Sequence, residues 1–235
     1  MKNLSILFSA MLLSYFSIAQ DSKFEFGIQL GPNITNMRYA SSTVQSKRAP
    51  QIAGTAGLFL QYNISNMFAI RTDPAFERLS DKSTEIIFTD PNGKSIGSGK
   101  MYFHYDYISV PILVRASIGN QVKFFLNAGP SLGFLFNQTT ISELTTQTSK
   151  TKNTDRYQTL NFGITSGIGI ALPVNEAFSL SLELRNNFGL SNISVSSNNN
   201  KAFKASTTSL LIGFSYKLGK SIRFSKQQET FSPTF

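Results

Sequence analysis

Residues 157–192, YQTLNFGITSGIGIALPVNEAFSLSLELRNNFGLSN, contain two alternating segments joined by a short turn. The first segment keeps apolar residues on one parity: Leu160, Phe162, Ile164, Ile168, Ile170 and Leu172. The second places Phe178, Leu180, Leu182 and Leu184 between Ser179, Ser181, Glu183 and Arg185. Because successive side chains of a strand point to opposite faces, each segment is predicted to be a strand with one apolar and one small or polar face.

The polar faces contain glycine and paired charges, and the alternation recurs along the chain. Eight such segments lie near residues 24–31, 51–62, 68–78, 101–116, 122–136, 160–172, 178–188 and 207–218. An apolar face toward lipid and a polar face toward a narrow lumen are typical of outer-membrane barrels. The sequence therefore predicts an all-β fold, an eight-stranded antiparallel transmembrane β-barrel. A soluble lipocalin-like barrel is the alternative.

The connections between these segments alternate in length. They are short after Tyr62, Ile118 and Leu172, and long after Leu30, Arg78, Phe136 and Phe188. Membrane barrels have short periplasmic turns and long extracellular loops, and an even strand number places both termini on one side. Outward aromatic residues also fall near the strand ends, as interfacial girdles require.

The long connections are expected to be polar loops, at residues 32–49, 79–100, 137–156 and 190–204. Within the second of them, TEIIF (84–88) is the segment best suited to prolong its strand. Pro74 cannot donate to a sheet ladder, so a bulge is expected near it. Pro111 predicts a second local irregularity for the same reason.

The first twenty residues, MKNLSILFSAMLLSYFSIAQ, have a basic start, an apolar run and small residues before Gln20. This pattern predicts a secretory signal peptide cut after Ala19. The alternative, an N-terminal membrane anchor, is disfavoured because the apolar run is short for a spanning helix. The expected layout is a signal peptide at 1–19, a barrel at 20–218 and a periplasmic C-terminal tail at 219–235.

The composition limits which covalent links, metal sites and partners are possible. The chain has no cysteine and one histidine, which rules out disulfides and the usual zinc ligand sets, so no metal or cofactor is expected. The net charge of +9 could suit nucleic acid. An exported chain without a basic cluster makes nucleic acid a poor partner. Outer-membrane lipid, lipopolysaccharide or an acidic protein surface fits better.

Five stretches carry a family resemblance: FEFGIQLGPNIT (24–35), YISVPILVRA (107–116), NAGPSLGFLF (127–136), FGITSGIGIAL (162–172) and FSLSLELRNNFGLSNIS (178–194). Through them the chain resembles the PorT-like outer-membrane beta-barrel proteins of Bacteroidota. The chain departs from that pattern at Ser109, where the family usually has an acidic residue, and in the residues that follow Leu218. The resemblance implies a barrel fold, an outer-membrane location and an association with protein secretion.

Nine charged residues are predicted to face the lumen: Glu25, Arg71, Asp73, Glu77, Arg115, Lys123, Glu183, Arg185 and Lys217. The interior of an eight-stranded barrel is just wide enough for side chains, and unpaired buried charges are costly. These four acids and five bases are therefore expected to pair and fill the lumen as a charge network. An ion-selective pore is the alternative.

The only histidine, His104, lies two residues before Asp106. Parity places both side chains outward at the outer rim, above the lipid-facing band. A histidine base needs a nucleophile within hydrogen-bond reach and an orienting acid. Asp106 can orient the ring, but Ser109 has the other parity, so a nucleophile would have to come from another strand. His104 and Asp106 are therefore a weak rim-site candidate, and no catalytic residue is expected.

The leading functional hypothesis is a non-enzymatic scaffold or accessory subunit of a larger outer-membrane complex serving secretion, uptake or barrel biogenesis. Its partners would be other outer-membrane or periplasmic proteins. A surface adhesion or ligand-binding barrel that uses loops 137–156 and 190–204 is the alternative. A lipid-modifying enzyme acting through His104 is a third hypothesis.

Overall fold

The computed structural model describes residues 23–39, 48–89, 92, 95–144, 148–194 and 203–218. Its strands are β1 (Phe24–Tyr39), β2 (Arg48–Pro50), β3 (Ile52–Asn63), β4 (Phe68–Thr72), β5 (Ala75–Thr89), β6 (Ser95–Ile118), β7 (Lys123–Leu144), β8 (Thr148–Lys152), β9 (Leu160–Pro173), β10 (Phe178–Gly189) and β11 (Phe203–Lys217). A short 3-10 helix, η2 (Thr154–Arg156), follows β8. The proposed signal peptide and tail lie outside the described residues.

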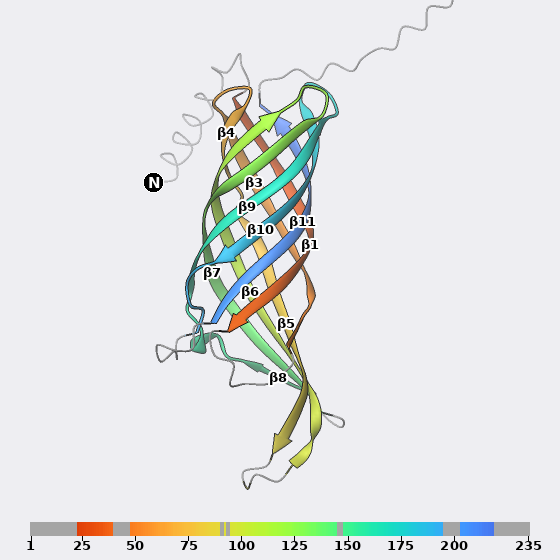
Figure 1. The fold of residues 1–235 in the computed structure, drawn as a ribbon, viewed down its shortest axis with the longest axis vertical. Coiled ribbons are helices and arrows are strands. Elements are labelled where there is room, and N and C mark those ends of the chain that lie inside the picture. Colours follow the sequence, from red (N-terminus) through yellow and green to blue (C-terminus); the bar gives the residue numbers. More distant parts are fainter. Residues whose placement is uncertain are drawn as a thin grey trace, which may run out of the picture.

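The strands close into a ring (Figure 1). Strand β1 pairs antiparallel with both β3 and β11, and the circuit continues through β4 and β5, β6, β7, β9 and β10 back to β11. Strands β4 and β5 occupy one position between β3 and β6, so the described ring has eight positions. The prediction of an eight-stranded antiparallel barrel is confirmed.

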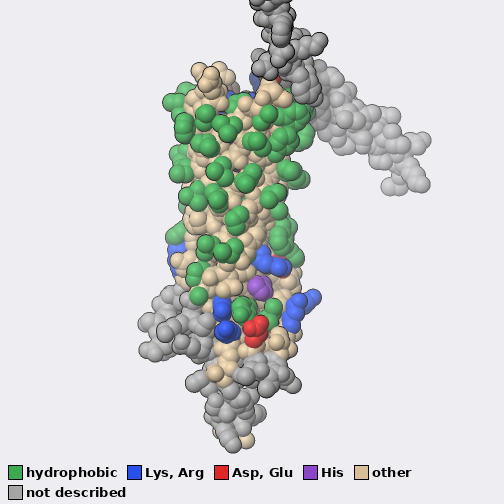
Figure 2. All heavy atoms as spheres, turned by 90° about the vertical axis from the view of Figure 1, so that its right-hand side faces the viewer, with side chains coloured by type: hydrophobic (Ala, Val, Ile, Leu, Met, Phe, Trp, Pro, Cys, Tyr) green, Lys and Arg blue, Asp and Glu red, His purple; other side chains and the backbone are tan. Residues whose placement is uncertain are grey.

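Burial is inverted relative to a soluble protein. Leu210 and Ile212 of β11 are 46% and 59% exposed, whereas Ser209 is 5% exposed. The same alternation places apolar side chains on the outside of every long strand, where they form the band seen in Figure 2. Outward apolar and inward polar residues are the arrangement that a bilayer selects.

The described turns at 64–67, 119–122 and 174–177 gather at the end where the described chain begins and ends (Figure 1). There the Leu218 N–H donates to the Phe24 carbonyl at 2.9 Å, and the Asn63 N–H donates to the Lys23 carbonyl at 2.7 Å. Short turns face the periplasm in membrane barrels, so this end is the periplasmic one. Aromatic side chains lie at this periplasmic end, where the ring centroids of Phe24 and Tyr62 are 5.0 Å apart.

The predicted loops are largely strand. Strand β1 runs to Tyr39, β5 to Thr89 and β7 to Leu144, and β6 begins at Ser95. The expected loops at 32–49, 79–100 and 137–156 are therefore wrong over most of their length, while TEIIF does prolong its strand in β5. Above the lipid both faces of a strand can be polar, so the apolar alternation disappears although backbone pairing continues. Figure 1 shows β5 and β6 projecting beyond the barrel as a long hairpin.

The prolines act differently from the prediction. The strand is interrupted at Asp73 and Pro74, but Leu60 pairs with Thr72 and Gly57 with Ala75 in one unbroken register, so no residue is inserted. The register of β6 with β7 also continues through Pro111. An extra residue occurs instead at Phe136 of β7, between the pairs Asp106–Asn137 and Tyr107–Leu135.

Some glycines are required by close backbone approach. A Cβ on Gly129 would lie 1.9 Å from the Ile112 carbonyl oxygen, well inside van der Waals contact. A Cβ on Gly54 would meet no atom within 4 Å. Glycine is therefore required at position 129 of β7, whereas position 54 of β3 has space for a larger side chain.

We predict that Gly129→Ala destabilises the barrel by about 1–3 kcal/mol because β6 and β7 must separate to admit the methyl group. Gly54→Ala is the matched control and should change stability by less than about 0.5 kcal/mol. Urea unfolding in lipid vesicles, followed by heat-modifiable mobility in gels, measures both. Equal stability of the two variants would contradict the steric argument.

Candidate functional site

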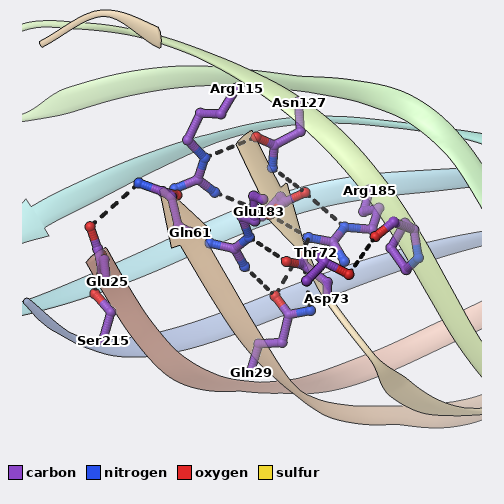
Figure 3. Close-up of polar contacts among 12 residues, drawn as sticks. Glu25, Gln29, Gln61, Thr72, Asp73, Arg115, Asn127, Glu183, Arg185 and Ser215 are labelled. Carbon is purple, nitrogen blue, oxygen red and sulfur yellow. Dashed lines mark hydrogen bonds and ion pairs between the residues drawn. The ribbon is translucent and has the colours of Figure 1, made fainter. Parts of the chain in front are cut away.

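Two arginines share one carboxylate in the middle of the lumen (Figure 3). Asp73 follows β4 at the strand interruption and is fully buried. Its Oδ1 accepts from Arg71 Nε at 2.5 Å, and its Oδ2 accepts from Arg185 Nη2 at 2.5 Å. The Asp73 N–H still donates to the Pro111 carbonyl of β6 at 3.4 Å, so the backbone stays in register while the side chain joins β4 to β10.

A second carboxylate extends this network toward the periplasm. Glu183 accepts from Arg185 Nε at 2.8 Å and from Asn127 Nδ2 at 3.0 Å. Arg115 Nε donates to Asn127 Oδ1 at 2.9 Å, and Arg115 Nη2 lies 3.8 Å from Glu183 Oε2. Strands β4, β6, β7 and β10 are thereby joined by one buried set of contacts.

The other predicted lumen acids lie apart from this network. Glu25 accepts from Ser215 Oγ at 2.5 Å and from Gln61 Nε2 at 3.4 Å. Glu77 is buried farther toward the outer end and is hydrogen-bonded by Asn187. The structure thus joins Arg71, Asp73, Arg115, Glu183 and Arg185 by ion pairs. Glu25 lies on the periplasmic side of this group, and Glu77 lies on its outer side, near enough to Arg185 for their charges to interact.

Lumen phenylalanines support the arginines and were missed from the sequence. The Arg71 guanidinium lies 3.6 Å from the Phe59 ring centroid, and that of Arg115 lies 3.9 Å from the Phe125 centroid. Such stacking favours a partly desolvated cation. A Cβ on Gly169 would lie 2.4 Å from the Phe125 ring, so glycine provides its space. The signal was present in parity, since both rings share the inward parity of the charges.

An apolar cluster fills the outer part of the lumen. Its buried members are Leu79, Tyr105, Tyr107, Leu135, Ile193, Phe203 and Ala205. The Tyr105 ring centroid lies 5.1 Å from that of Tyr157 and 6.3 Å from that of Phe203. Ile193 and Phe203 come from the predicted loop 190–204, so this cap could not be found from strand alternation.

The periplasmic end of the lumen is hollow. A cavity of about 440 Å³ lies there, and its lining includes Lys23, Glu25, Arg115, Lys123 and Lys217. Lys123 and Lys217, which were assigned to the lumen charge network, therefore line this mouth. Among the described residues, the outer and central lumen is filled by side chains, and the accessible space lies at the periplasmic end.

The rim residues lie beyond the apolar band at the extracellular end, and Figure 2 shows the histidine (purple) just below the band in that view. Ser80 Oγ of β5 lies 2.8 Å from His104 Nδ1, so the structure supplies a serine that the sequence search did not find. The register pairs Ser80 with His104 directly, and a hairpin alignment of β5 with β6 could have revealed it. Ser80 is only 2% exposed, which leaves a substrate little access to its hydroxyl.

Asp106 serves a different partner at this rim. Its oxygens accept from Arg78 Nε at 2.6 Å, Arg78 Nη2 at 3.1 Å and Asn137 Nδ2 at 2.9 Å. Burial alone would raise the pKa of Asp106, but these hydrogen bonds and the charge of Arg78 hold its pKa below the ordinary value. Burial lowers the pKa of His104, Arg78 and Lys150 lower it further, and Asp106 opposes them.

Within the described ranges, no group of three or more histidine, cysteine, aspartate or glutamate residues could hold a metal ion. Among these same residues, no helix is long and apolar enough to cross a membrane.

Comparisons place this geometry among known proteins. The model of the family described as outer membrane protein beta-barrel domain matches residues 18–195. No curated protein matches the sequence. Among solved structures, the chain is similar to Neisserial surface protein A (14% identity, 82% of this chain and 96% of that chain, TM-score 0.43). It is also similar to OprG from Pseudomonas aeruginosa (11%, 83% and 96%, TM-score 0.46) and to Ail of Yersinia pestis (13%, 82% and 99%, TM-score 0.39).

We predict that Asp73→Ala destabilises the barrel by about 3–5 kcal/mol, because it leaves two buried arginines without their shared carboxylate. Asp73→Asn keeps one oxygen acceptor and should lose less. Asp155→Ala removes an exposed carboxylate beyond the barrel and should change stability by less than about 0.5 kcal/mol. Urea unfolding in vesicles gives all three values. A loss for Asp73→Ala no larger than that of the control would contradict the network's role.

We predict that His104 titrates below the ordinary histidine pKa, because burial and two nearby cations favour the neutral ring. The chain has one histidine, so NMR of histidine-labelled protein reports this site alone. Asp106→Asn should lower the midpoint further, since it removes the negative charge that favours the protonated ring, and Arg78→Gln should raise it. A midpoint at or above the ordinary value, or no response to Asp106→Asn, would contradict this electrostatic account.

Proposed function

The chain belongs to the outer membrane protein beta-barrel domain family, and on this premise we propose that it is a non-enzymatic accessory subunit or scaffold of a larger outer-membrane complex. That complex would serve secretion, uptake or barrel biogenesis. The barrel lies in the outer membrane.

The observation that carries the proposal is the filling of the lumen. The apolar cap and the buried ion pairs occupy its outer and central parts, which argues against an ion-selective pore. Function then has to use the two ends of the barrel or its lipid-facing wall. A barrel whose lumen is filled, and whose two ends remain accessible, is suited to binding other subunits of a membrane complex.

We also propose membership of the PorT-like group of Bacteroidota and a cleaved signal peptide at 1–19. Both rest on the sequence, on the five stretches and on the leader pattern. An association with secretion follows from that resemblance.

The side chains of the outer rim favour lipopolysaccharide as the lipid partner. Basic side chains lie below the apolar band in the view of Figure 2. Arg38 stacks 3.7 Å from the Phe188 ring centroid and donates to the Gly189 carbonyl at 2.8 Å, while Lys82 lies 5.4 Å from the Tyr102 ring. Cations held on aromatic residues at this depth suit the phosphate groups of lipopolysaccharide.

The alternative is a surface adhesion or ligand-binding barrel. The observation that favours it is the β5–β6 hairpin, which projects beyond the barrel at the extracellular end (Figure 1). A lipid-modifying enzyme acting through His104 has less support, because Ser80 is buried and Asp106 is bonded to Arg78 and Asn137.

Crosslinking in cells followed by purification in mild detergent tests the proposal. We expect a stoichiometric protein partner to copurify with the barrel. The matched variant lacks residues 84–100 and joins Ser83 to Met101 through an Asn-Gly turn, which is feasible because these two residues are register partners. It should keep the same partner.

A lone monomer in repeated preparations would contradict the accessory-subunit proposal. If the hairpin deletion abolishes binding to a host or surface ligand while the copurified complex stays intact, the adhesion alternative is selected instead.

A further inference from the structure

The periplasmic mouth of the barrel contains a cavity of about 440 Å³, here called the vestibule. It lies between the short turns and the ion-pair network, and Lys23, Glu25, Arg115, Lys123, Phe125 and Lys217 are part of its lining. Its volume falls within the range of small-ligand sites, about 300–1,000 Å³.

The charges of this lining are strongly unbalanced. Four of these residues are basic, and only Glu25 is acidic. The Glu25 carboxylate already accepts hydrogen bonds from Ser215 and Gln61. The vestibule therefore concentrates positive potential within a low-dielectric wall, which attracts anions.

The bases occupy opposite walls of the ring. Lys23 and Lys217 flank the paired strands β1 and β11, whereas Arg115 and Lys123 lie on the paired strands β6 and β7. In the eight-position ring, these two pairs of strands are four positions apart. A ligand that reaches both walls must carry at least two separated negative groups.

Arg115 is the residue of the vestibule best placed to bind an anionic group. It is 5% exposed, its Nε is bonded to Asn127, and Phe125 packs against its guanidinium. Among the described residues, its Nη2 has no hydrogen-bond partner, and its ion-pair contact with Glu183 Oε2 is 3.8 Å long, beyond hydrogen-bond distance. A buried donor without an acceptor is costly, so an incoming anionic oxygen at this position would be stabilised.

We propose that the vestibule binds an acidic peptide segment of a periplasmic partner, with carboxylates on both walls and one of them at Arg115. The inference rests on the proposed function and names the chemistry of the partner. Side-chain amides and hydroxyls in the same lining, including Gln61, Asn63 and Ser179, can bond the peptide backbone.

Other occupants fit less well. The chain's own residues 219–235 contain Lys220, Arg223 and Lys226 against Glu229, so their charge repels the vestibule. A single phosphate would need donors that converge on one point, whereas these bases come from opposite walls.

The test uses the full mature chain in detergent micelles and two synthetic probes, the acidic tetrapeptide acetyl-Glu-Asp-Glu-Asp-amide and its neutral counterpart acetyl-Gln-Asn-Gln-Asn-amide. We expect saturable calorimetric binding of the acidic probe only. NMR amide shifts should move at the periplasmic end, including Gln61 and Lys123, and not near His104.

The combined variant Lys23→Glu and Lys123→Glu should weaken this binding by about tenfold or more, since two attractions become repulsions. The control Lys150→Glu and Lys152→Glu makes the same charge change on the exposed strand β8 and should bind normally. Heat-modifiable mobility verifies that each variant is folded.

Four results would overturn the inference: no saturable binding by the unaltered chain, equal binding of the neutral probe, unchanged affinity in the Lys23→Glu and Lys123→Glu variant, or displacement by an equal concentration of inorganic phosphate. If any of these occurs while a protein partner still copurifies from cells, only the vestibule assignment fails. Loss of copurification would instead remove the proposed function.

Discussion

The contact of Asp73 with Arg71 and Arg185 is the interaction on which the barrel interior depends. Buried ion pairs are expensive to desolvate, so their net contribution to stability is modest, but a missing partner is very costly. The same contact specifies register. A slip of one residue along β4 would turn Arg71 toward lipid and an apolar neighbour inward, because side chains alternate across a strand. Glycines on neighbouring strands complete the arrangement: a Cβ on Gly167 would lie 2.4 Å from the Glu183 carboxylate.

The lumen is divided into three zones by the chemistry of its inward side chains. Tyr105, Ile193 and their neighbours exclude water at the outer end, and the ion pairs occupy the middle. At the periplasmic end, the described residues enclose a cavity of about 440 Å³. This asymmetry follows from residue size, since large rings and arginines fill the outer and central levels while the mouth is lined by lysines and small polar residues. The two ends of this barrel therefore differ, since the outer lumen is filled and the periplasmic mouth is hollow.

Much of the fold could be predicted from the sequence, because lipid imposes a strict period of two wherever a strand crosses it. The prediction failed where lipid ends. The polar stretches of β5 and β7 carry no apolar face, so the sequence predicts loops there, yet their backbones still pair with β6. The site was less predictable. Parity identified which charges face inward, but it could not say that Asp73 would serve two arginines or that Ser80 would meet His104. Those contacts depend on register between strands.

By itself, the sequence determined the membrane-facing alternation, the number of crossings and the sign of the charges inside, since each is a property of neighbouring residues along one strand. Only the tertiary structure decided which charges pair, where the lumen is filled and where it is open. Ring closure brings β1 against β11 and sets β6 and β7 on the opposite wall. The vestibule and the placement of Arg115 in its lining exist because of that closure. They arise from distances across the barrel, and no local pattern in the chain encodes those distances.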